Sequence, residues 1–403
     1  MTRTLRIFIS VAEHSADVHG AALLRAAAER LPATAFHGLC GPRMRAAGAA
    51  ALADLTAHSA MLSHIGGVLG RALRAVRLVE RSWDADPPDV VVLLDSPELH
   101  LGIPELGVPG LAPRARQRGL PVLYYIAPQT WAARAWRNSR LRGCVDQLAC
   151  ILPFEQAYFR ARGIATEFVG HPLFESLAQQ SPNAQVVAAL RDPSRPTIAL
   201  LPGSRRSVID AMLPLQLDVV RRLAARGVQP TVAISCVSWE RRAQIQAHVE
   251  RAALPLDAAR VCVLVADNAS LLSAADLVLV ASGTATLEVA HYRKPMIVMY
   301  DAGRLLVTLE RTIGRRFIRT PHLSLVNLLA NARVVPEFMP AAPDPDAVAR
   351  VASQLLHDLT WRRLMIDQID GLVRPLAATR ASTHVCELIA KLAQAHRVGT
   401  HPA

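Results

Sequence analysis

Short apolar runs alternate with helical patterns along most of the chain. In the first half these runs are rich in β-branched and aliphatic residues, as buried strands are. They lie at residues 5–12, 89–95, 121–126, 146–152 and, more weakly, 166–170. A second series follows at residues 196–204, 231–236, 260–266, 275–283 and 295–300. From about residue 346 onward the pattern predicts helices only.

This order predicts an α/β fold with two doubly wound, Rossmann-like domains and a cleft between them, because strands that alternate with helices form parallel sheets covered on both faces. We predict a first domain over residues 1–185, a second over 186–370, and a C-terminal helix over 371–403 that can pack back on the first domain. The polar stretch at 178–185 is part of the hinge region. Ligands of such sheets bind beyond the carboxyl ends of the strands, so the loops after strands are the candidate sites.

Arginine supplies nearly all of the positive charge. The chain has 403 residues and a formal net charge of +12 at pH 7. Arginine forms paired hydrogen bonds with phosphate and carboxylate groups, so the charge favours an anionic partner such as nucleic acid, anionic lipid or a phosphorylated substrate. A GC-rich genome would also raise the arginine content, and composition alone leaves both interpretations open.

The cysteines and the apolar runs bear on where the protein works. Six cysteines, at positions 40, 144, 150, 236, 262 and 386, show no CxxC spacing. This argues against a disulfide framework or a zinc site and favours a reducing cytoplasm. The first apolar run, residues 7–11, is too short for a signal peptide, and none reaches the ~18–20 residues of a membrane span. We expect a protein that is soluble or lies on a membrane surface.

A tight turn follows the strand that ends near residue 201. In the segment LPGSRRS (201–207), Gly203 permits the turn. Ser204, Arg205, Arg206 and a helix N-terminus can then bind a phosphate. The Gly-Lys-Ser/Thr ending of a Walker A loop is missing. An exposed turn with solvated arginines explains these residues equally well.

A second such turn lies in ASGTATLE (281–288). Ser282, Gly283 and Thr284 follow an apolar strand and can donate hydrogen bonds to a ligand. Glu288 sits about one turn into the next helix, where its carboxylate can accept two hydrogen bonds from a ribose diol. A capped helix start with an acidic residue near the helix dipole is an equally good explanation.

Two polar loops follow strands in the first half. Asp95 ends the strand at 89–95, where a carboxylate can act as a general base on a hydroxyl or cap the following turn. The loop at 12–20 is dense in polar groups, and an N-cap together with a substrate contact explains it best. His14 and His19 suit a metal poorly because their i,i+5 spacing does not place them on one helix face.

Two further segments combine basic and apolar residues. Residues 127–142 hold Gln129, two tryptophans and four arginines, which suits nucleobase stacking or a lipid headgroup layer. No nucleic-acid-binding motif accompanies them, so we expect no nucleic-acid partner. Residues 61–83 form the clearest amphipathic helix, which is typical of a membrane surface or of an ordinary outer helix. Its arginines are Arg71, Arg74, Arg77 and Arg81, and its apolar stripe is Leu69, Leu73, Val76 and Val79. Residues 304–319 form a shorter basic stretch.

Together these segments resemble the lipid-A-disaccharide synthases, a family of inverting glycosyltransferases with the GT-B fold. The resemblance covers about residues 5–340. The matching runs, in order, are CGPRMRAAG (40–48), Asp-Ser-Pro (95–97), YYIAPQTWA (124–132), LPFE (152–155), FVGHPL (168–173), LPGSRRS, ASGTATLE and SLVNLLANARVVPEF (324–338). LPGSRRS and ASGTATLE are the most specific, and PQ-x-WA followed by FVGHPL makes a chance match improbable.

The resemblance implies a reaction and its partners. UDP-2,3-diacylglucosamine would donate its sugar to the 6-hydroxyl of 2,3-diacylglucosamine 1-phosphate, giving a β-1,6-linked disaccharide 1-phosphate and UDP. The second domain would hold the UDP-linked acyl sugar, and the first would hold the acyl monosaccharide phosphate and face the membrane. Because both substrates carry acyl chains, the enzyme would work in the cytoplasm as a peripheral protein on the inner, anionic surface of the cytoplasmic membrane. GT-B enzymes generally need no bound metal, so we expect neither a metal nor a cofactor.

The resemblance also implies residue roles. Asp95 matches the proposed base. The UDP-sugar would contact Gly203, Ser204, Arg205, Arg206, Ser282, Gly283, Thr284, Glu288, Asn327 and Glu337. The acceptor would contact Glu13, Ser15, Asp17, Gln129 and Trp131.

The sequence departs from the family pattern mainly in loops expected to face the acceptor. Where the family reads like Gly-Glu-Ala-Ser-Gly-Asp, this chain has Ala-Glu-His-Ser-Ala-Asp at 12–17. Alanine in place of glycine implies a changed loop or a changed ligand. Glu98 and His100 stand where the family has Asp and Asn, and prolines at 104, 109 and 113 interrupt the helix expected there.

Two other functions stay open. The loop departures suit a related GT-B glycosyltransferase with a different acceptor or donor. A GT-B scaffold without activity could instead bind a partner or a membrane, although the presence of Asp95, Glu288, Arg205 and Arg206 argues against it. The sequence does not give the acyl-chain length or the oligomeric state, and a homodimer is one assembly that it leaves open.

Overall fold

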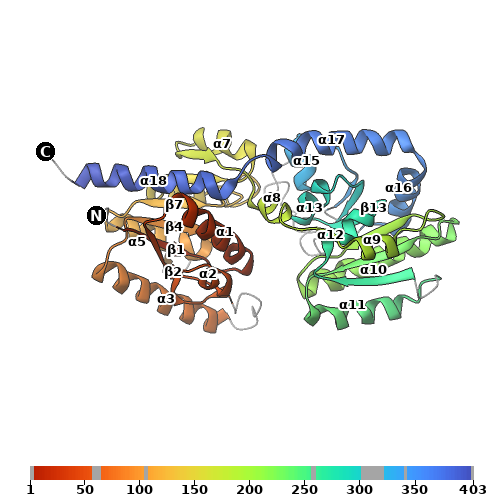
Figure 1. The fold of residues 1–403 in the computed structure, drawn as a ribbon, viewed down its shortest axis with the longest axis horizontal. Coiled ribbons are helices and arrows are strands. Elements are labelled where there is room, and N and C mark those ends of the chain that lie inside the picture. The colour runs from red at the N-terminus through yellow and green to blue at the C-terminus, as the bar shows by residue number, and fades with distance from the viewer. Residues whose placement is uncertain are drawn as a thin grey trace. The chain divides into compact units, whose positions relative to one another are not determined.

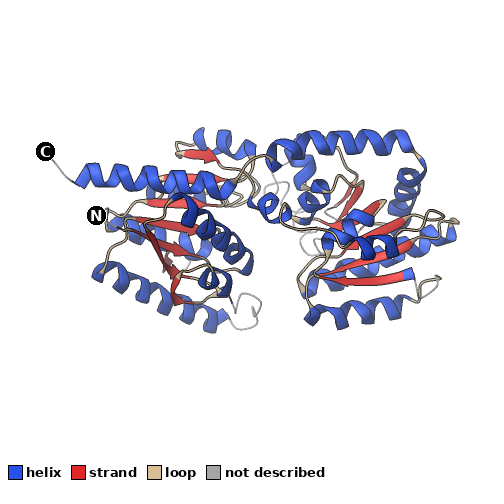
Figure 2. Cartoon of the chain, viewed as in Figure 1, coloured by secondary structure: helices blue, strands red, loops and turns tan. Residues whose placement is uncertain are grey.

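The chain folds into two compact α/β units. The computed structural model describes residues 4–56, 65–103, 108–255, 260–300, 322–339 and 343–400. The first unit comprises Met1–Pro172 and Thr379–Ala403, and the second comprises Leu173–Ala378. In each unit a parallel sheet is covered by helices (Figures 1 and 2). The predicted fold class is therefore confirmed.

The first unit is built on a seven-stranded sheet in which all paired strands are parallel. The strand order is β3-β2-β1-β4-β7-β8-β9, so the order reverses between β1 and β4. The strands are β1 Leu5–Ser10, β2 Thr34–Leu39, β3 Ala50–Ala53, β4 Val90–Leu94, β7 Val122–Tyr125, β8 Gln147–Cys150 and β9 Thr166–Phe168. A separate antiparallel pair consists of β5 Gly102–Ile103 and β6 Val108–Pro109.

Helices cover both faces of this sheet. They are α1 His14–Arg30, α2 Pro42–Ala46, α3 Ile65–Ala85, α4 Pro97–His100, α5 Leu111–Gln117, α6 Arg137–Cys144, α7 Pro153–Arg160 and α18 Ala381–Thr400. The last helix, α18, lies beside α1 although the two are far apart in the sequence (Figure 1). The chain thus returns to its first unit after completing the second.

Alternate residues of the central strands enter two separate cores, because side chains of a strand point to opposite faces in turn. Ile7 and Ile9 pack in the core formed with α1 and α18, whereas Phe8 packs in the core formed with α3 and α5. Strand β4 divides in the same way and is buried along its whole length. A polar side chain cannot be placed within such strands at low cost, so polar groups begin only where the strands end.

The described part of α3 has the amphipathic pattern that the sequence predicts. Val76, Val79 and Trp83 are buried against the sheet. Arg74, Arg77 and Arg81 are exposed on the other side. Residues 61–64, the side chains at 69 and 71, and the basic stretch at 304–319 lie outside the described residues.

The second unit has a six-stranded parallel sheet in the order β12-β11-β10-β13-β14-β15, which reverses between β10 and β13. The strands are β10 Thr197–Leu201, β11 Thr231–Cys236, β12 Val261–Val265, β13 Leu277–Ala281, β14 Met296–Met299 and β15 Glu337–Phe338. The helices are α8 Pro172–Leu177, whose first residue closes the first unit, α9 Ala184–Leu190, α10 Arg206–Ala225, α11 Trp239–Ala252, α12 Asn268–Ala274, α13 Ala285–His291, α15 Leu325–Ala330, α16 Pro345–His357 and α17 Leu359–Ala377.

Each of the ten apolar runs in the sequence contains a strand. The sequence pattern predicts neither the antiparallel pair of β5 and β6 nor three strands of the parallel sheets. The three are β2, β3 and β15. β2 contains a histidine and a glycine, β3 is mostly alanine, and β15 has two residues, so none shows a run of β-branched residues. From residue 345 the described chain is helical, as predicted. All six cysteines are free. Among the described helices, none is long and apolar enough to cross a membrane.

Candidate functional site

Many of the predicted site residues lie at the two places where strand order reverses. In the first unit, the loops after β1 and β4 carry Glu13 and Asp95. In the second, the loops after β10 and β13 carry Gly203 and Gly283. At such a point neighbouring loops run to opposite faces of the sheet and leave a crevice in which a ligand binds. Each unit therefore offers one candidate site at the carboxyl edge of its sheet.

Within the first unit, backbone strain is concentrated at the candidate site. Among the described residues of that unit, four non-glycine residues have a positive φ: Asp95, Ser96, Ile126 and Arg134. All four lie in the loops after β4 and β7, which are neighbouring strands. Ile126 is β-branched, and such residues rarely adopt this conformation. Strain of this kind persists only where surrounding contacts enforce it, and it clusters at functional sites.

The Asp95 carboxylate is largely buried and has an unusual acidity. Burial, followed by the nearby negative charge of Glu13, raises the pKa of Asp95 to about 6. Glu98 contributes in the same direction, and a backbone hydrogen bond opposes it. Burial disfavours the charged carboxylate, which makes the group a better proton acceptor than a surface aspartate. A carboxylate with this pKa is still mostly ionised at neutral pH.

Glu98 connects the loop after β4 to the segment after β7. Its Oε1 accepts hydrogen bonds from Arg134 Nη1 at 2.8 Å and Arg137 Nη2 at 2.5 Å. Arg137 is buried, and its Nε has no hydrogen-bond partner among the described residues. The hydroxyl of Ser96, next to Asp95, is likewise buried without a partner in the described chain.

The loop after β1 and the first turn of α1 carry both exposed and buried polar groups. Glu13 and Ser15 are exposed, and Glu13 is the N-cap residue of α1. Asp17 is fully buried, and its carboxylate accepts backbone N–H bonds from Arg43 at 2.9 Å and Met44 at 3.1 Å. These bonds cap the start of α2 and hold it against α1. The Asp17 carboxylate thus supports α2 from within the protein, and its contact with the acceptor stays a prediction.

The two alanines of this loop do not strain it. Neither Ala12 nor Ala16 has a positive φ, and Ala16 lies within α1. Glycine is not required at either position, so the substitution of alanine leaves an ordinary strand-to-helix connection.

The loop after β7 is supported by a buried carboxylate that the sequence analysis did not select. Trp131 Nε1 donates a hydrogen bond to Glu155 Oε1 at 2.9 Å. Glu155 also accepts the backbone N–H groups of Ile151 and Leu152. Burial raises the pKa of Glu155 to about 7, although these three donors oppose the shift. The PQ-x-WA and LPFE motifs therefore form one unit that fixes Trp131, while Gln129 stays exposed.

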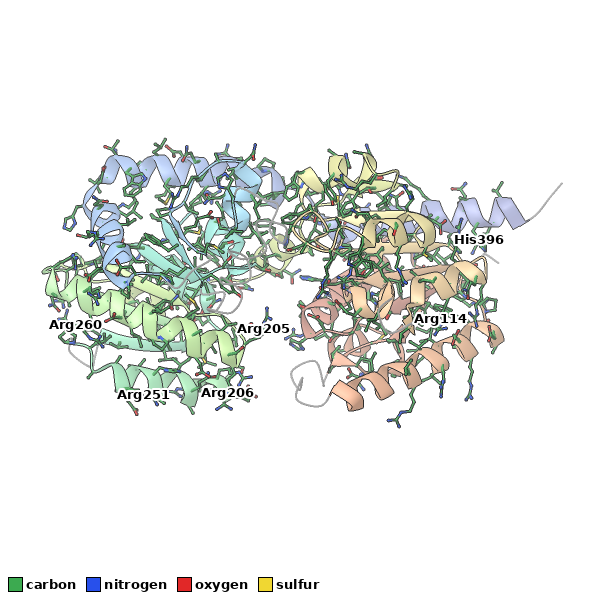
Figure 3. All side chains as sticks on the ribbon, turned by 180° about the vertical axis from the view of Figure 1, so that it is seen from behind. Arg114, Arg205, Arg206, Arg251, Arg260 and His396 are labelled. Carbon is green, nitrogen blue, oxygen red and sulfur yellow. The ribbon has the colours of Figure 1, made fainter. Side chains whose placement is uncertain are left out.

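In the second unit, the loop after β10 presents cationic groups at a helix start. Gly203 has φ +106°, and a Cβ there would lie 2.8 Å from a methyl group of Val208. Ser204, Arg205 and Arg206 are exposed where α10 begins (Figure 3). Within the described chain neither guanidinium forms an ion pair. A helix N-terminus with two unpaired arginines is an arrangement that attracts anions.

The loop after β13 places a carboxylate near the same edge of the sheet. Gly283 has φ +139°, and its carbonyl accepts a hydrogen bond from the Thr286 hydroxyl at 2.8 Å. Ser282 is half-buried, and Thr284 is exposed at the start of α13. Glu288, one turn into α13, is largely buried, and this burial raises its pKa.

The partners of Glu288 are not among the residues predicted from the sequence. Asn268 Nδ2 donates to both carboxylate oxygens, at 3.1 and 3.2 Å. Asn268 Oδ1 accepts a hydrogen bond from the Ser235 hydroxyl at 2.6 Å. Both residues lie at carboxyl ends, Ser235 in β11 and Asn268 just after β12. That position after a strand was the signal available in the sequence.

Asn327 and Glu337 brace the segments on both sides of α15. Asn327 is fully buried, and its amide bonds to the backbone of Val334 and Val335 and to Glu337 Oε2. Glu337 also accepts the backbone N–H of Ser324 at 3.1 Å. These bonds use both donors of the Asn327 side chain and both acceptor sites. The Asn327 side chain is thus engaged within the protein, and the UDP-sugar contact implied by the resemblance stays a prediction.

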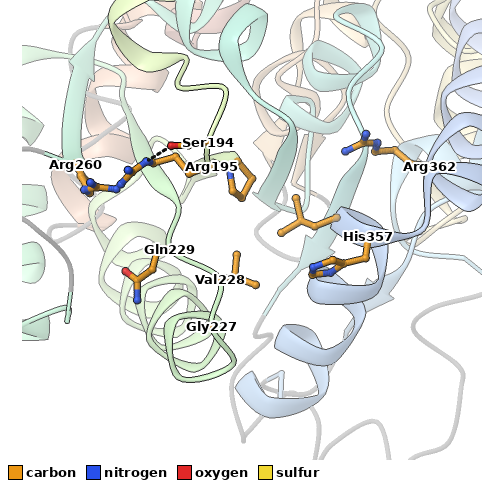
Figure 4. Close-up of a pocket in the computed structure, with 10 residues that line it drawn as sticks. Ser194, Arg195, Gly227, Val228, Gln229, Arg260, His357 and Arg362 are labelled. Carbon is orange, nitrogen blue, oxygen red and sulfur yellow. Dashed lines mark hydrogen bonds between the residues drawn. The ribbon is translucent and has the colours of Figure 1, made fainter.

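A separate hollow in the second unit lies at the opposite edge of the sheet. Arg195, Gln229 and Arg260 line it just before β10, β11 and β12, and His357 comes from the end of α16 (Figure 4). Because ligands of this fold bind at carboxyl ends, we do not assign the hollow to the candidate site. Among the described residues, no three His, Cys, Asp or Glu side chains gather as metal ligands would.

Comparison with known sequences assigns the chain to one family. The model of the family described as lipid-A-disaccharide synthetase matches residues 7–383. A lipid-A-disaccharide synthase of Pseudomonas aeruginosa is 33% identical over 394 residues, covering 96% of this chain and 99% of that protein. One from Pseudomonas putida is 32% identical over 386 residues, covering 96% and 98%.

Solved structures share the fold at low sequence identity. The Staphylococcus aureus MnaA–UDP structure has a TM-score of 0.65 and 12% identity, covering 94% of each chain. The UDP-GlcNAc 2-epimerase of Neisseria meningitidis bound to UDP-GlcNAc has a TM-score of 0.63 and 11% identity, covering 97% of this chain and all of that one. MurG of Acinetobacter baumannii has a TM-score of 0.57 and 16% identity, covering 96% and 99%. These similarities establish the GT-B fold.

The supporting role of Asp17 can be tested by stability. Asp17→Asn replaces one carboxylate oxygen by an amide that cannot accept the N–H bonds of α2, so the free energy of unfolding should fall by about 1–3 kcal/mol. Ser15→Ala, in the same helix but exposed, should change it by less than about 0.5 kcal/mol. Urea unfolding followed by tryptophan fluorescence measures both. Equal stability of the two variants would show that the cap does not matter.

Proposed function

Because the chain belongs to the lipid-A-disaccharide synthase family, and is thus a glycosyltransferase of lipid A biosynthesis that forms a disaccharide, we propose its substrates and the roles of its residues. The donor is UDP-2,3-diacylglucosamine, and the acceptor is 2,3-diacylglucosamine 1-phosphate. The products are the β-1,6-linked disaccharide 1-phosphate and UDP. The observation that supports this most directly is the buried Asp95 carboxylate at a strained strand end, in a chain that matches this family along nearly its whole length.

Asp95 acts as the general base. It accepts the proton of the acceptor's 6-hydroxyl as that oxygen bonds to the anomeric carbon of the donor sugar. The bond from this carbon to the UDP oxygen breaks, and UDP leaves with the electron pair. Attack on the face opposite the leaving group inverts the anomeric centre and gives the β linkage. A positioned base of suitable pKa contributes about 10²–10⁴-fold to such a step.

The second unit binds the donor. Arg205, Arg206 and the N-terminus of α10 hold the diphosphate and stabilise the negative charge that grows on it as UDP leaves. Glu288 accepts hydrogen bonds from the ribose hydroxyls, and Asn268 keeps its carboxylate in the required orientation. Gly203, Ser204, Ser282, Gly283 and Thr284 form the two turns that enclose the nucleotide, and Asn327 and Glu337 shape the loop beside them.

The first unit binds the acceptor. The exposed side chains of Glu13, Ser15 and Gln129 contact the sugar. Asp17 and Trp131 act through the loops that they fix, since the hydrogen-bonding groups of both are engaged within the protein. A related enzyme with a different acceptor is the second candidate. The observation that favours it is Glu98, which stands where the family has Asp and forms hydrogen bonds with Arg134 and Arg137.

The helix α3 brings the enzyme to its lipid substrates. Arg74, Arg77 and Arg81 form an exposed basic face, and the side chain of Leu78 among them is 40% exposed. Anionic lipid headgroups attract such a face, and an exposed apolar residue can enter the interface. The proposed location is therefore the cytoplasmic membrane surface.

The reaction is tested by incubating the purified protein with both acyl substrates and measuring UDP release and the mass of the product. The expected result is UDP together with one disaccharide 1-phosphate. Asp95→Asn, which keeps the shape but not the base, should lose at least about 100-fold in kcat. Asp367→Asn is a matched control at an exposed position of α17. Absence of UDP release would contradict the proposal, and release only with another acceptor would favour the related enzyme.

The acidity of Asp95 predicts a pH profile. Its pKa is raised to about 6, and the base must be ionised to accept a proton. Below pH 6, kcat/KM should therefore fall about tenfold per unit, and above it should level off. Glu155, whose pKa is about 7, does not contact the reaction, so the acid limb should persist in Glu155→Gln. If the fall in kcat/KM at low pH disappears in Glu155→Gln, it reports the ionisation of Glu155, and its assignment to Asp95 is wrong.

The proposed contacts of Arg205 and Arg206 with the diphosphate predict how their removal changes the Kd for UDP. Arg205→Ala or Arg206→Ala each removes a charge-assisted hydrogen bond worth about 1.5–3 kcal/mol, so the Kd for UDP should rise about 10–100-fold. Arg251→Ala, which removes an exposed arginine of α11, should leave it unchanged (Figure 3). Calorimetric titration measures these values. If the Kd of all three variants equals that of the unchanged protein, the diphosphate lies elsewhere.

The membrane role of α3 is tested with vesicles. Replacing Arg74, Arg77 and Arg81 by glutamine removes about 1 kcal/mol of attraction per charge, so binding to anionic phosphatidylglycerol vesicles should weaken about 100-fold. The matched control replaces the exposed Arg251, Arg350 and Arg363 of the second unit, which changes the net charge equally. Vesicle sedimentation at low and high salt reports both. Equal losses would mean that only net charge matters.

A further inference from the structure

The backbone carbonyl of Asp95 accepts two short hydrogen bonds from buried side chains. Tyr124 Oη lies 2.6 Å from this oxygen, and His100 Nδ1 lies 2.6 Å from it. A carbonyl oxygen only accepts, so both side chains are donors. Both are completely buried, and their rings meet edge to face at 5.9 Å. The two bonds use both lone pairs of the Asp95 carbonyl.

These contacts determine the tautomer of His100. Because Nδ1 donates to a carbonyl, Nδ1 carries the proton of the neutral ring. Nε2 then accepts a hydrogen bond from the Ser10 hydroxyl, 2.9 Å away. Burial lowers the pKa of His100 to about 4, so the ring is neutral at neutral pH. The same cause raises the pKa of Tyr124 well above its usual value, so its hydroxyl stays a donor.

We call His100, Tyr124 and Ser10, with the hydrogen bonds described above, the clamp on the Asp95 carbonyl. The clamp joins three neighbouring strands at their carboxyl ends. Ser10 is the last residue of β1, Asp95 follows β4, and Tyr124 lies in β7. β4 pairs with β1 on one side and β7 on the other. His100, at the end of the short helix α4, connects the first of these strands to the turn that carries Asp95.

The turn needs such support because its backbone is unfavourable. Asp95 has φ 51° and Ser96 has φ 45°, so two successive non-glycine residues adopt the left-handed conformation. This conformation is unfavourable for a residue that carries a side chain. The direction of the Asp95 side chain follows from this backbone. Without the clamp the turn would relax, and the carboxylate would leave the position that the strained backbone gives it.

We propose that His100 is a positioning residue for Asp95, acting through the Asp95 carbonyl as an Nδ1–H donor held in place by Ser10. This inference rests on the proposed role of Asp95 as the base. His100 touches no substrate, so its loss lowers kcat and leaves the KM of both substrates unchanged. A displaced base costs more than the hydrogen bond itself, because a shift of about 1 Å can cost about 100-fold in rate.

Two conservative variants separate this role from simple packing. The amide nitrogen of asparagine reaches the place of the histidine Nδ1, whereas the amide of glutamine reaches the place of Nε2. His100→Asn therefore keeps the bond to Asp95 and loses the one to Ser10. His100→Gln keeps the bond to Ser10 and loses the one to Asp95. Asparagine is smaller than glutamine and leaves the larger cavity, so a pure packing role would make His100→Asn the more damaging variant, which is the opposite order.

The test measures kcat and KM for UDP release from both acyl substrates, with thermal unfolding of each variant. His100→Asn should retain kcat within about fivefold, the value of one ordinary hydrogen bond. His100→Gln should lose about 100-fold in kcat with KM unchanged. Tyr124→Phe, which removes the other donor to the same oxygen, should also lower kcat without changing KM. His37→Asn, a half-buried histidine in β2 that packs on Phe8, is the matched control and should keep full activity.

The outcomes distinguish the positioning role of His100 from the role of Asp95 as the base. If the unchanged protein turns over and Asp95→Asn does not, the role of Asp95 stands, and the contrast between asparagine and glutamine then decides the role of His100. A kcat of His100→Asn equal to or below that of His100→Gln, or a change confined to KM or to the melting temperature, would overturn the positioning role alone. An inactive unchanged protein, or full activity of Asp95→Asn, would remove the base and the positioning role together.

Discussion

The chemistry of this protein depends on the double burial of its parallel sheets. Each central strand sends alternate side chains into two cores, as Ile7 and Phe8 do in β1. A polar side chain within such a strand would lose its hydration without gaining a partner, at a cost of about 1–3 kcal/mol or more. Polar groups are thereby confined to the strand ends, and the loops diverge only where strand order reverses. Both candidate sites lie at these points.

The two units solve the same turn problem in different ways. In the second unit, Gly203 and Gly283 adopt positive φ without steric cost, so backbone and arginines can approach an anion closely. In the first unit, the proposed base Asp95 stands at the turn itself, where glycine would carry no carboxylate, and its positive φ is strained. The buried donors His100 and Tyr124 offset that strain. A site that binds with its backbone can thus be built from glycine, whereas a site that reacts through a side chain needs a supporting clamp.

The sequence predicts the parts of this arrangement that burial dictates. Continuous apolar runs identify ten strands, and a carboxylate or glycine after such a run identifies Asp95, Gly203 and Gly283. β2, β3 and β15 escape detection because their residues lack that pattern. Sequence cannot show whether a polar loop residue faces a ligand or the backbone, since both uses favour the same residue types. Asp17 and Asn327 suggested ligand contacts and proved to be engaged internally, whereas Asn268 and Ser235 gave no motif.

The acidity of Asp95 follows from the same constraint and fits the proposed reaction. Burial at the strand end, together with Glu13 and Glu98, raises its pKa to about 6. At pH 7 about nine in ten copies are still ionised, and each is a stronger proton acceptor than a solvated aspartate. A deeper position would raise the pKa further and leave the carboxyl protonated, while an exposed one would weaken the base. The boundary between the buried strand and the open loop is therefore where a carboxylate combines both properties, and the clamp on its carbonyl keeps it at that boundary.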